Sequence, residues 1–122
     1  MIATPTLSIS PEKVSSVIDR AHRRDSAQAL PDDEPLPFHA DAPALQELAR
    51  IIDDLTDDEQ ADIIALMWLG RGDGEVSEWH ELREEAALLH NKKATAYLLA
   101  KPLLADYLAE GLASLGYRSH AN

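Results

Sequence analysis

The sequence predicts an all-α fold, a single-domain bundle of about five helices around a central apolar helix at residues 57–69. Apolar residues recur at spacings of three, four and seven along most of the chain, as on a helix that faces a core. Ala and Leu outnumber Val, Ile and Thr, and no segment alternates apolar and polar residues as a half-buried strand does. A length of 122 residues suits one compact domain.

The first helix is predicted within residues 1–26. Ser10 is suited to cap it, and Pro11 stands at the first helical position, where a missing N–H costs nothing. Apolar residues from Val14 to Ala21 follow at helical spacing and draw one stripe. Ile9, just before the cap, is placed to pack on that stripe.

Residues 27–43 do not favour regular structure. They hold several prolines, which remove backbone donors and disfavour helical geometry at the preceding residue. We expect an extended, acidic connection here. A connection of this length is unusual inside a compact domain. Either it has a function of its own, or the first helix is a loosely held arm able to reach another subunit.

Residues 44–116 are predicted to form the helical core, followed by a tail at 117–122. Thr56 and Glu59 match a capping box, in which each side chain accepts a backbone N–H from the other residue. The segment Ile63–Leu69 is apolar at every position, which predicts a helix enclosed on all sides. Gly70 is the expected stop of this helix.

The second half of the core carries three further helical segments. Ser77 is expected to cap a helix that turns Trp79, Leu82, Ala86 and Leu89 inward. A short helix after Thr95 and a final helix from Pro102 to Leu115 follow. The apolar side of the final helix is wider than one neighbour needs, and Gly111 permits close approach. This width indicates a position between two layers or at a subunit interface.

The chain carries an excess of acidic residues, which limits the classes of partner it can bind. The formal net charge is −11, and residues 27–62 hold eleven acidic side chains but one basic one. This excess argues against nucleic acid or membrane as a direct partner, since both require a positive surface. The longest apolar run is too short for a membrane span. With no cysteine and no secretory signal pattern, we expect a cytoplasmic protein.

An acidic face is predicted where the second helix meets the third. It is either a solubilising surface or a docking face for a basic partner, including mimicry of a nucleic-acid backbone. Its residues are Asp53, Asp54, Asp57, Asp58, Glu59 and Asp62.

The two tryptophans mark a second candidate surface. Trp68 and Trp79 flank a glycine-containing turn that holds Arg71 and Asp73. Arg71 is expected either to stack on a ring or to pair with Asp73. These four residues are the binding candidates, either as a structural corner or as a small recognition pocket.

No catalytic set is assembled in the sequence, and we expect no metal and no cofactor. The weak alternative is His80 with Glu84, which are four residues apart and so share a helix face. The second histidine of a helical zinc motif is absent.

The order of several motifs resembles a bacterial family of small acidic proteins known only as a domain of unknown function. The resemblance spans almost the whole chain, and it implies a single helical domain without assigning an activity. The motifs are Leu7-Ser8-Ile9-Ser10-Pro11-Glu12-Lys13-Val14, Trp68-Leu69-Gly70-Arg71-Gly72-Asp73, Trp79, Tyr97-Leu98-Leu99 and Pro102-Leu103-Leu104.

Three functions follow as hypotheses. The first is a non-enzymatic helical module that binds another protein or regulates it and associates with itself. The second is a small metal-dependent hydrolase that uses His80 and Glu84. The third is an acidic mimic of nucleic acid that binds a basic protein.

Overall fold

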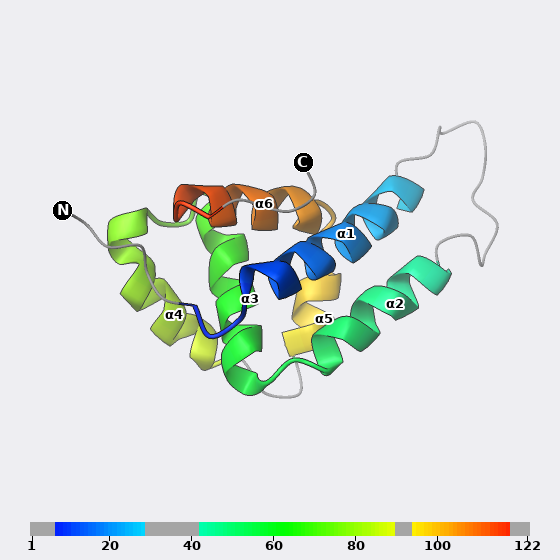
Figure 1. Cartoon of the computed structure of the whole chain (residues 1–122), viewed down its shortest axis with the longest axis horizontal. Helices are drawn as coiled ribbons and strands as arrows, with labels where there is room; N and C mark the ends of the chain where they lie inside the picture. The colour runs from blue at the N-terminus through cyan, green and yellow to red at the C-terminus, as the bar shows by residue number, and fades with distance from the viewer. Residues whose placement is uncertain (1–6, 29–41, 90–93, 118–122) are drawn as a thin grey trace.

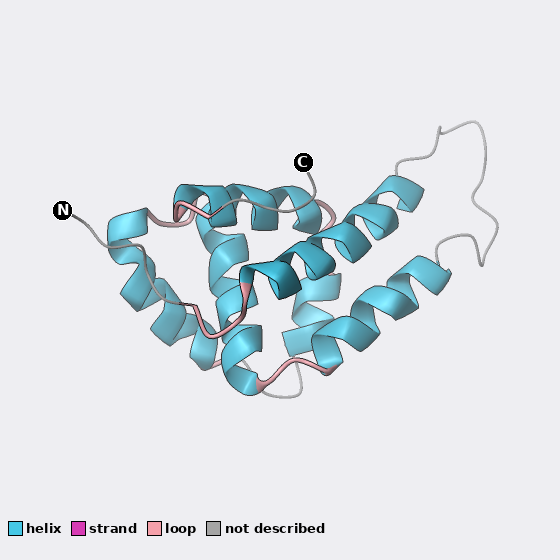
Figure 2. Cartoon of the chain, viewed as in Figure 1, coloured by secondary structure: helices cyan, strands magenta, loops and turns pink. Residues whose placement is uncertain are grey.

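The computed structural model describes residues 7–28, 42–89 and 94–117. Within these ranges the chain forms six α-helices and one short 3₁₀ helix and contains no strand, which confirms the all-α prediction (Figure 2). Most of the predicted connection at 27–43, and all of the tail at 117–122 except Tyr117, lie outside the described residues. In chain order the elements are α1 (Pro11–Gln28), α2 (Ala42–Asp53), α3 (Asp57–Arg71), η1 (Val76–Glu78), α4 (Trp79–Ala87), α5 (Ala94–Leu99) and α6 (Leu104–Ser114).

Helix α3 stands at the centre of the molecule, with α4 on one side and α2 and α5 on the other (Figure 1). It packs most extensively against α6 and α4, while α1 packs against α6 and α2. Helix α6 therefore contacts both α3 and α1. Its wide apolar side is explained by this position between two layers, one of the two alternatives that the sequence left open.

The sequence around α3 explains its central position. The Glu59 N–H donates to Thr56 Oγ1 at 3.1 Å and the Thr56 N–H donates to Glu59 Oε1 at 2.9 Å, so the predicted capping box is present. The five residues from Ile63 to Met67 are fully buried, and Leu69 is 6% exposed. The predicted central helix is therefore confirmed, with Trp68 as its half-buried member.

Gly70 does not end α3, contrary to the prediction. The helix continues to Arg71, and Gly72 ends it with a φ of 94° in the left-handed region that favours glycine. Gly70 instead lies where α3 and α6 cross. A Cβ at Gly70 would lie 1.8 Å from the Tyr107 carbonyl oxygen, and one at Gly111 would lie 2.1 Å from the Leu66 carbonyl oxygen. Only glycine permits this approach.

Helix α1 is part of the core and not a loosely held arm. Val14, Val17 and Ala21 are fully buried, and the Lys13 N–H donates to Ser10 Oγ at 3.2 Å, as the predicted cap requires. The helix extends two residues beyond the predicted boundary, to Gln28.

A buried arginine ties α1 to the turn between α5 and α6. The Arg24 side chain is 1% exposed, and its guanidinium donates to the carbonyl oxygens of Leu99 at 2.7 Å and Lys101 at 2.5 Å. Its Nε donates to Asp25 Oδ1 at 2.8 Å, while Asp25 Oδ2 accepts the Ala105 N–H at 3.1 Å. We refer to these contacts as the Arg24–Asp25 clamp.

Three predictions for the C-terminal half are corrected by the structure, and the clamp explains the first of them. The final helix begins at Leu104 and not at Pro102, because the preceding carbonyls face Arg24 and not a continuing helix. Helix α5 begins at Ala94, so Thr95 lies inside it, and the Thr95 hydroxyl donates to Asp53 Oδ1. Leu89, expected to face inward, is 37% exposed because it lies beyond the end of α4.

Two acidic side chains of α3 hold the N-terminal segment. Asp62, 2% exposed, accepts the backbone N–H groups of Ser8 at 2.5 Å and Ile9 at 3.0 Å and pairs with Arg83 Nε at 2.5 Å. Glu59 pairs with Lys13 Nζ at 2.8 Å. The hydrogen bond from Lys13, followed by the one from the Thr56 backbone, lowers the pKa of Glu59 below its ordinary value of 4.5.

Among the described residues, none of the helices is long and apolar enough to cross a membrane.

We predict that Gly70→Ala lowers the free energy of unfolding by about 3 kcal/mol or more, because the methyl group forces two backbones apart. Gly74→Ala is the matched control, since the nearest atoms to its Cβ would belong to the flexible Leu82 side chain, at 3.1 Å, and not to backbone. Its cost should stay below about 1 kcal/mol. Urea unfolding followed by circular dichroism measures both, and equal stability of the two variants would contradict the crossing described here.

We predict that Glu59→Gln makes stability less dependent on pH. Glutamine keeps the capping hydrogen bond but removes the charge that faces Lys13, at a cost of about 0.5–1 kcal/mol near neutral pH. Because the pKa of Glu59 is lowered by folding, its ionic contribution is present above pH 4.5 and is lost as the pH falls through the lowered value. Urea unfolding at several pH values measures the difference in free energy of unfolding between the variant and wild type. This difference should shrink once the pH falls below the lowered pKa of Glu59.

The control for this variant is Glu110→Gln, which makes the same charge change at an exposed position on α6. The free energy of unfolding of Glu59→Gln is compared with that of wild type at each pH. If this difference stays constant with pH, or if Glu110→Gln reproduces it, the Lys13–Glu59 ion pair is not its cause.

Candidate functional site

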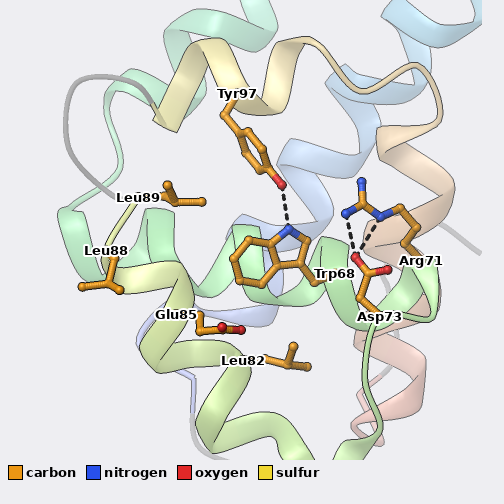
Figure 3. Close-up of a pocket in the computed structure, with 8 residues that line it drawn as sticks. All are labelled: Trp68, Arg71, Asp73, Leu82, Glu85, Leu88, Leu89 and Tyr97. Atoms are coloured by element: carbon orange, nitrogen blue, oxygen red, sulfur yellow. Dashed lines mark hydrogen bonds and ion pairs between the residues drawn. The ribbon is translucent and has the colours of Figure 1, made fainter.

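A solvent-open hollow of about 480 Å³ lies beside the C-terminal end of α3, between α4 and α5 (Figure 3). It combines an aromatic pair, an ion pair and an aliphatic wall. Its lining residues are Trp68, Arg71, Asp73, Leu82, Glu85, Leu88, Leu89 and Tyr97. We call this feature the Trp68 hollow.

The aromatic pair joins α3 to α5. Trp68 Nε1 donates to the Tyr97 hydroxyl at 2.7 Å, and the two rings meet edge to face with centroids 6.4 Å apart. The Lys101 ammonium lies 4.4 Å from the Tyr97 ring centroid, in cation–π geometry. Because the indole N–H already has an acceptor, what Trp68 offers to a ligand is its apolar ring.

The ion pair sits on the turn that ends α3. Arg71 Nε and Nη2 donate to Asp73 Oδ2 at 2.9 and 2.6 Å, which is one of the two arrangements expected for Arg71. The left-handed backbone at Gly72 reverses the chain and brings the two side chains together. The hydrogen bond from Arg71 to Asp73 is the main reason why the pKa of Arg71 is raised.

The aliphatic wall comes from α4 and the two residues after it. Leu82 and Glu85 are three positions apart on α4 and so lie on one side of the helix, and Leu89 lies in the turn that follows it. In Figure 3, Leu82, Glu85, Leu88 and Leu89 lie together on the α4 side of the Trp68 ring. Leu88 is 78% exposed and Leu89 37%, so two adjacent leucines present apolar surface at the edge of the hollow.

The structure brings together three of the four binding candidates that the sequence predicted. Trp68, Arg71 and Asp73 line the hollow, whereas Trp79 does not. The Trp79 side chain is 8% exposed and packs in the core, on the same side of α4 as Ala86. Sequence reasoning did not find Tyr97 and the α4 wall, because these residues meet Trp68 only through tertiary packing.

The predicted acidic face divides into two groups. Asp53, Asp54, Asp57 and Asp58 are exposed, at the end of α2 and the start of α3. Glu59 and Asp62 are buried and hold the N-terminal segment, as described above. These two carboxylates are therefore structural groups, and the exposed acidic surface is smaller than the sequence predicts.

The alternative metal pair lies on the outer side of α4. His80 Nε2 and Glu84 Oε2 are 3.2 Å apart, and the side chains are 82% and 68% exposed. Among the described residues, no group of three or more His, Cys, Asp or Glu side chains is placed to hold a metal ion.

Together the helices and the hollow define a small all-helical domain with a preformed recess at the end of its central helix. The chain belongs to the family described as "Protein of unknown function (DUF3775)", whose model matches residues 45–117. This match confirms the resemblance to a family of unknown function and includes every residue of the Trp68 hollow. The motif at residues 7–14 and the whole of α1 precede the matched span. The chain matches neither a curated protein nor a solved structure.

We predict that Tyr97→Phe lowers the free energy of unfolding by about 1 kcal/mol, because the half-buried indole N–H of Trp68 loses its acceptor. The Trp68 indole signal in a ¹H–¹⁵N NMR spectrum should move at the same time. Tyr107→Phe is the control, since the structure shows no hydrogen-bond partner for the Tyr107 hydroxyl among the described residues. An unchanged Trp68 signal in Tyr97→Phe would contradict the Trp68–Tyr97 bond.

Proposed function

We propose that this protein is a non-enzymatic protein-binding module and that the Trp68 hollow is its contact surface. The observation that carries the proposal is the exposure of Leu88, 78%, at the edge of a recess that also contains a half-buried tryptophan. An exposed leucine beside an aromatic recess loses unfavourable contact with water when a partner covers it.

The composition of the hollow supports the same function. Tryptophan, tyrosine and arginine are the residue types that contribute most to binding energy at protein interfaces. Here all three come together in Trp68, Tyr97 and Arg71, next to three leucines. A volume of about 480 Å³ is enough for one or two side chains of a partner and falls within the range of about 300–1,000 Å³ of ligand pockets.

The hollow is also held in shape before binding. The Trp68–Tyr97 hydrogen bond joins α3 to α5, and the Arg71–Asp73 pair holds the turn after α3. The Arg24–Asp25 clamp holds the turn that places Lys101 over Tyr97. In a preformed recess, binding loses less free energy to the ordering of side chains, which favours recognition of a short segment.

Self-association stays a prediction from the sequence. Each copy carries a formal net charge of −11, so two copies repel each other at long range. This repulsion favours a different protein as the partner over a second copy.

We predict that Leu88→Ser weakens binding of hollow-dependent peptides about tenfold, because burial of the leucine side chain contributes about 1–2 kcal/mol. A random peptide library displayed on phage and panned against the wild-type protein supplies the peptides, and isothermal titration measures their affinities. The matched control is Leu103→Ser, which alters another exposed leucine, 48% accessible and outside the hollow.

Binding that Leu88→Ser loses and Leu103→Ser keeps supports the proposed function. If panning enriches no peptide, or if the enriched peptides bind both variants equally, the hollow is not the contact surface.

A further inference from the structure

One carboxylate in the Trp68 hollow has no counter-charge. Asp73 is neutralised by Arg71, at 2.6 Å, whereas the Glu85 carboxylate has no hydrogen-bond or ion-pair partner among the described residues. Glu85 is exposed and lies on α4 between Leu82 and Leu89, in the middle of the aliphatic wall. The lining residues therefore carry one net negative charge, placed beside the apolar surface, and the Lys101 ammonium over the Tyr97 ring is a cation at the α5 side of the hollow.

The same sign of charge continues along α4. Glu81 is exposed one helical turn before Glu85, and Leu88 follows at the next turn on the same side of the helix. The cation of the hollow, Arg71, already donates two hydrogen bonds to Asp73. A ligand that enters here meets a negative potential from α4, and the overall charge of −11 adds to it.

The Trp68 ring completes a site for a basic side chain. Its indole N–H is used by Tyr97, so the ring is left as an apolar and cation-attracting surface beside Glu85. Lysine and arginine have long aliphatic stems that pack on such surfaces while the charged end reaches a carboxylate.

We propose that the Trp68 hollow binds a basic–apolar segment of another protein, and this proposal rests on the function proposed above. A Lys or Arg side chain of the segment packs along Trp68 and forms an ion pair with Glu85. A neighbouring aliphatic side chain covers Leu82, Leu88 and Leu89. A second copy of this chain is a poorer occupant, because it brings a further net charge of −11 to an acidic wall.

The test uses three short synthetic peptides that share their leucine positions and carry only Lys, only Gln or only Glu at the others. Each is titrated into ¹⁵N-labelled full-length protein while the indole signals of the two tryptophans are followed. We expect the Lys peptide to shift the Trp68 signal and leave the buried Trp79 signal nearly unchanged. Its affinity at low salt should exceed that of the Gln peptide by about fivefold or more and fall as salt screens the charges.

Matched variants separate the Glu85 contact from the general acidity of the chain. Glu85→Gln should weaken the Lys peptide about three- to fivefold, as expected for an exposed ion pair. Glu110→Gln makes the same change in net charge on α6, outside the hollow, and should leave the affinity unchanged. Glu85→Lys should reverse the preference, so that the Glu peptide binds better than the Lys peptide.

The outcomes distinguish this inference from the proposed function. If the Gln or Glu peptide shifts the Trp68 signal at the same concentration as the Lys peptide, the hollow binds proteins without selecting basic ones, and only the inference fails. Equal weakening by Glu85→Gln and Glu110→Gln also overturns it, since the attraction is then not local. If no peptide shifts the Trp68 indole signal, the inference fails. The proposed function is then decided by the peptide-library experiment with Leu88→Ser.

Discussion

The fold depends on the close crossing of α3 and α6, where two glycines let backbone atoms meet. Gly70 faces the Tyr107 carbonyl and Gly111 faces the Leu66 carbonyl, at distances that no Cβ would allow. This crossing lets α6 lie deep enough to contact both α3 and α1. Because Gly70 faces α6, Trp68, two positions earlier, lies on the opposite side of α3, toward α4 and α5. The position of the hollow thus follows from the way α3 and α6 pack against each other.

The sequence predicts those parts of the fold that rest on local interactions. The Ser10 cap and the Thr56–Glu59 capping box involve residues three positions apart, and the structure confirms both. Gly70 and Gly72 show why other features escape prediction. Both glycines follow the apolar run, and either one is a plausible helix stop. Gly72 takes the left-handed backbone that ends the helix, whereas Gly70 is glycine because the Tyr107 carbonyl, distant in sequence, leaves no space for a side chain.

The same distinction applies to the site. Trp68, Arg71 and Asp73 lie within six consecutive residues, so their grouping was predictable. Tyr97 belongs to a different helix, and no pattern around it indicates that its hydroxyl accepts the Trp68 indole N–H. Trp79 is close to the turn in sequence but falls on the core side of α4. Glu59 and Asp62 were assigned to the surface because they are charged, yet each is satisfied in the interior by a cation and by backbone N–H groups.

The Arg24–Asp25 clamp has a consequence for how the chain reaches its native state. Its three hydrogen bonds from α1 to residues 99, 101 and 105 join positions 75 to 80 apart, and its α1 half precedes the span matched by the family. On the ribosome, α1 emerges long before the α5–α6 turn that receives Arg24. The side of α1 that packs against α6 therefore stays uncovered until α6 is available, and contacts of such long range slow folding. Among the described helices, α1 is synthesised before the others and yet is among the last to be locked in place.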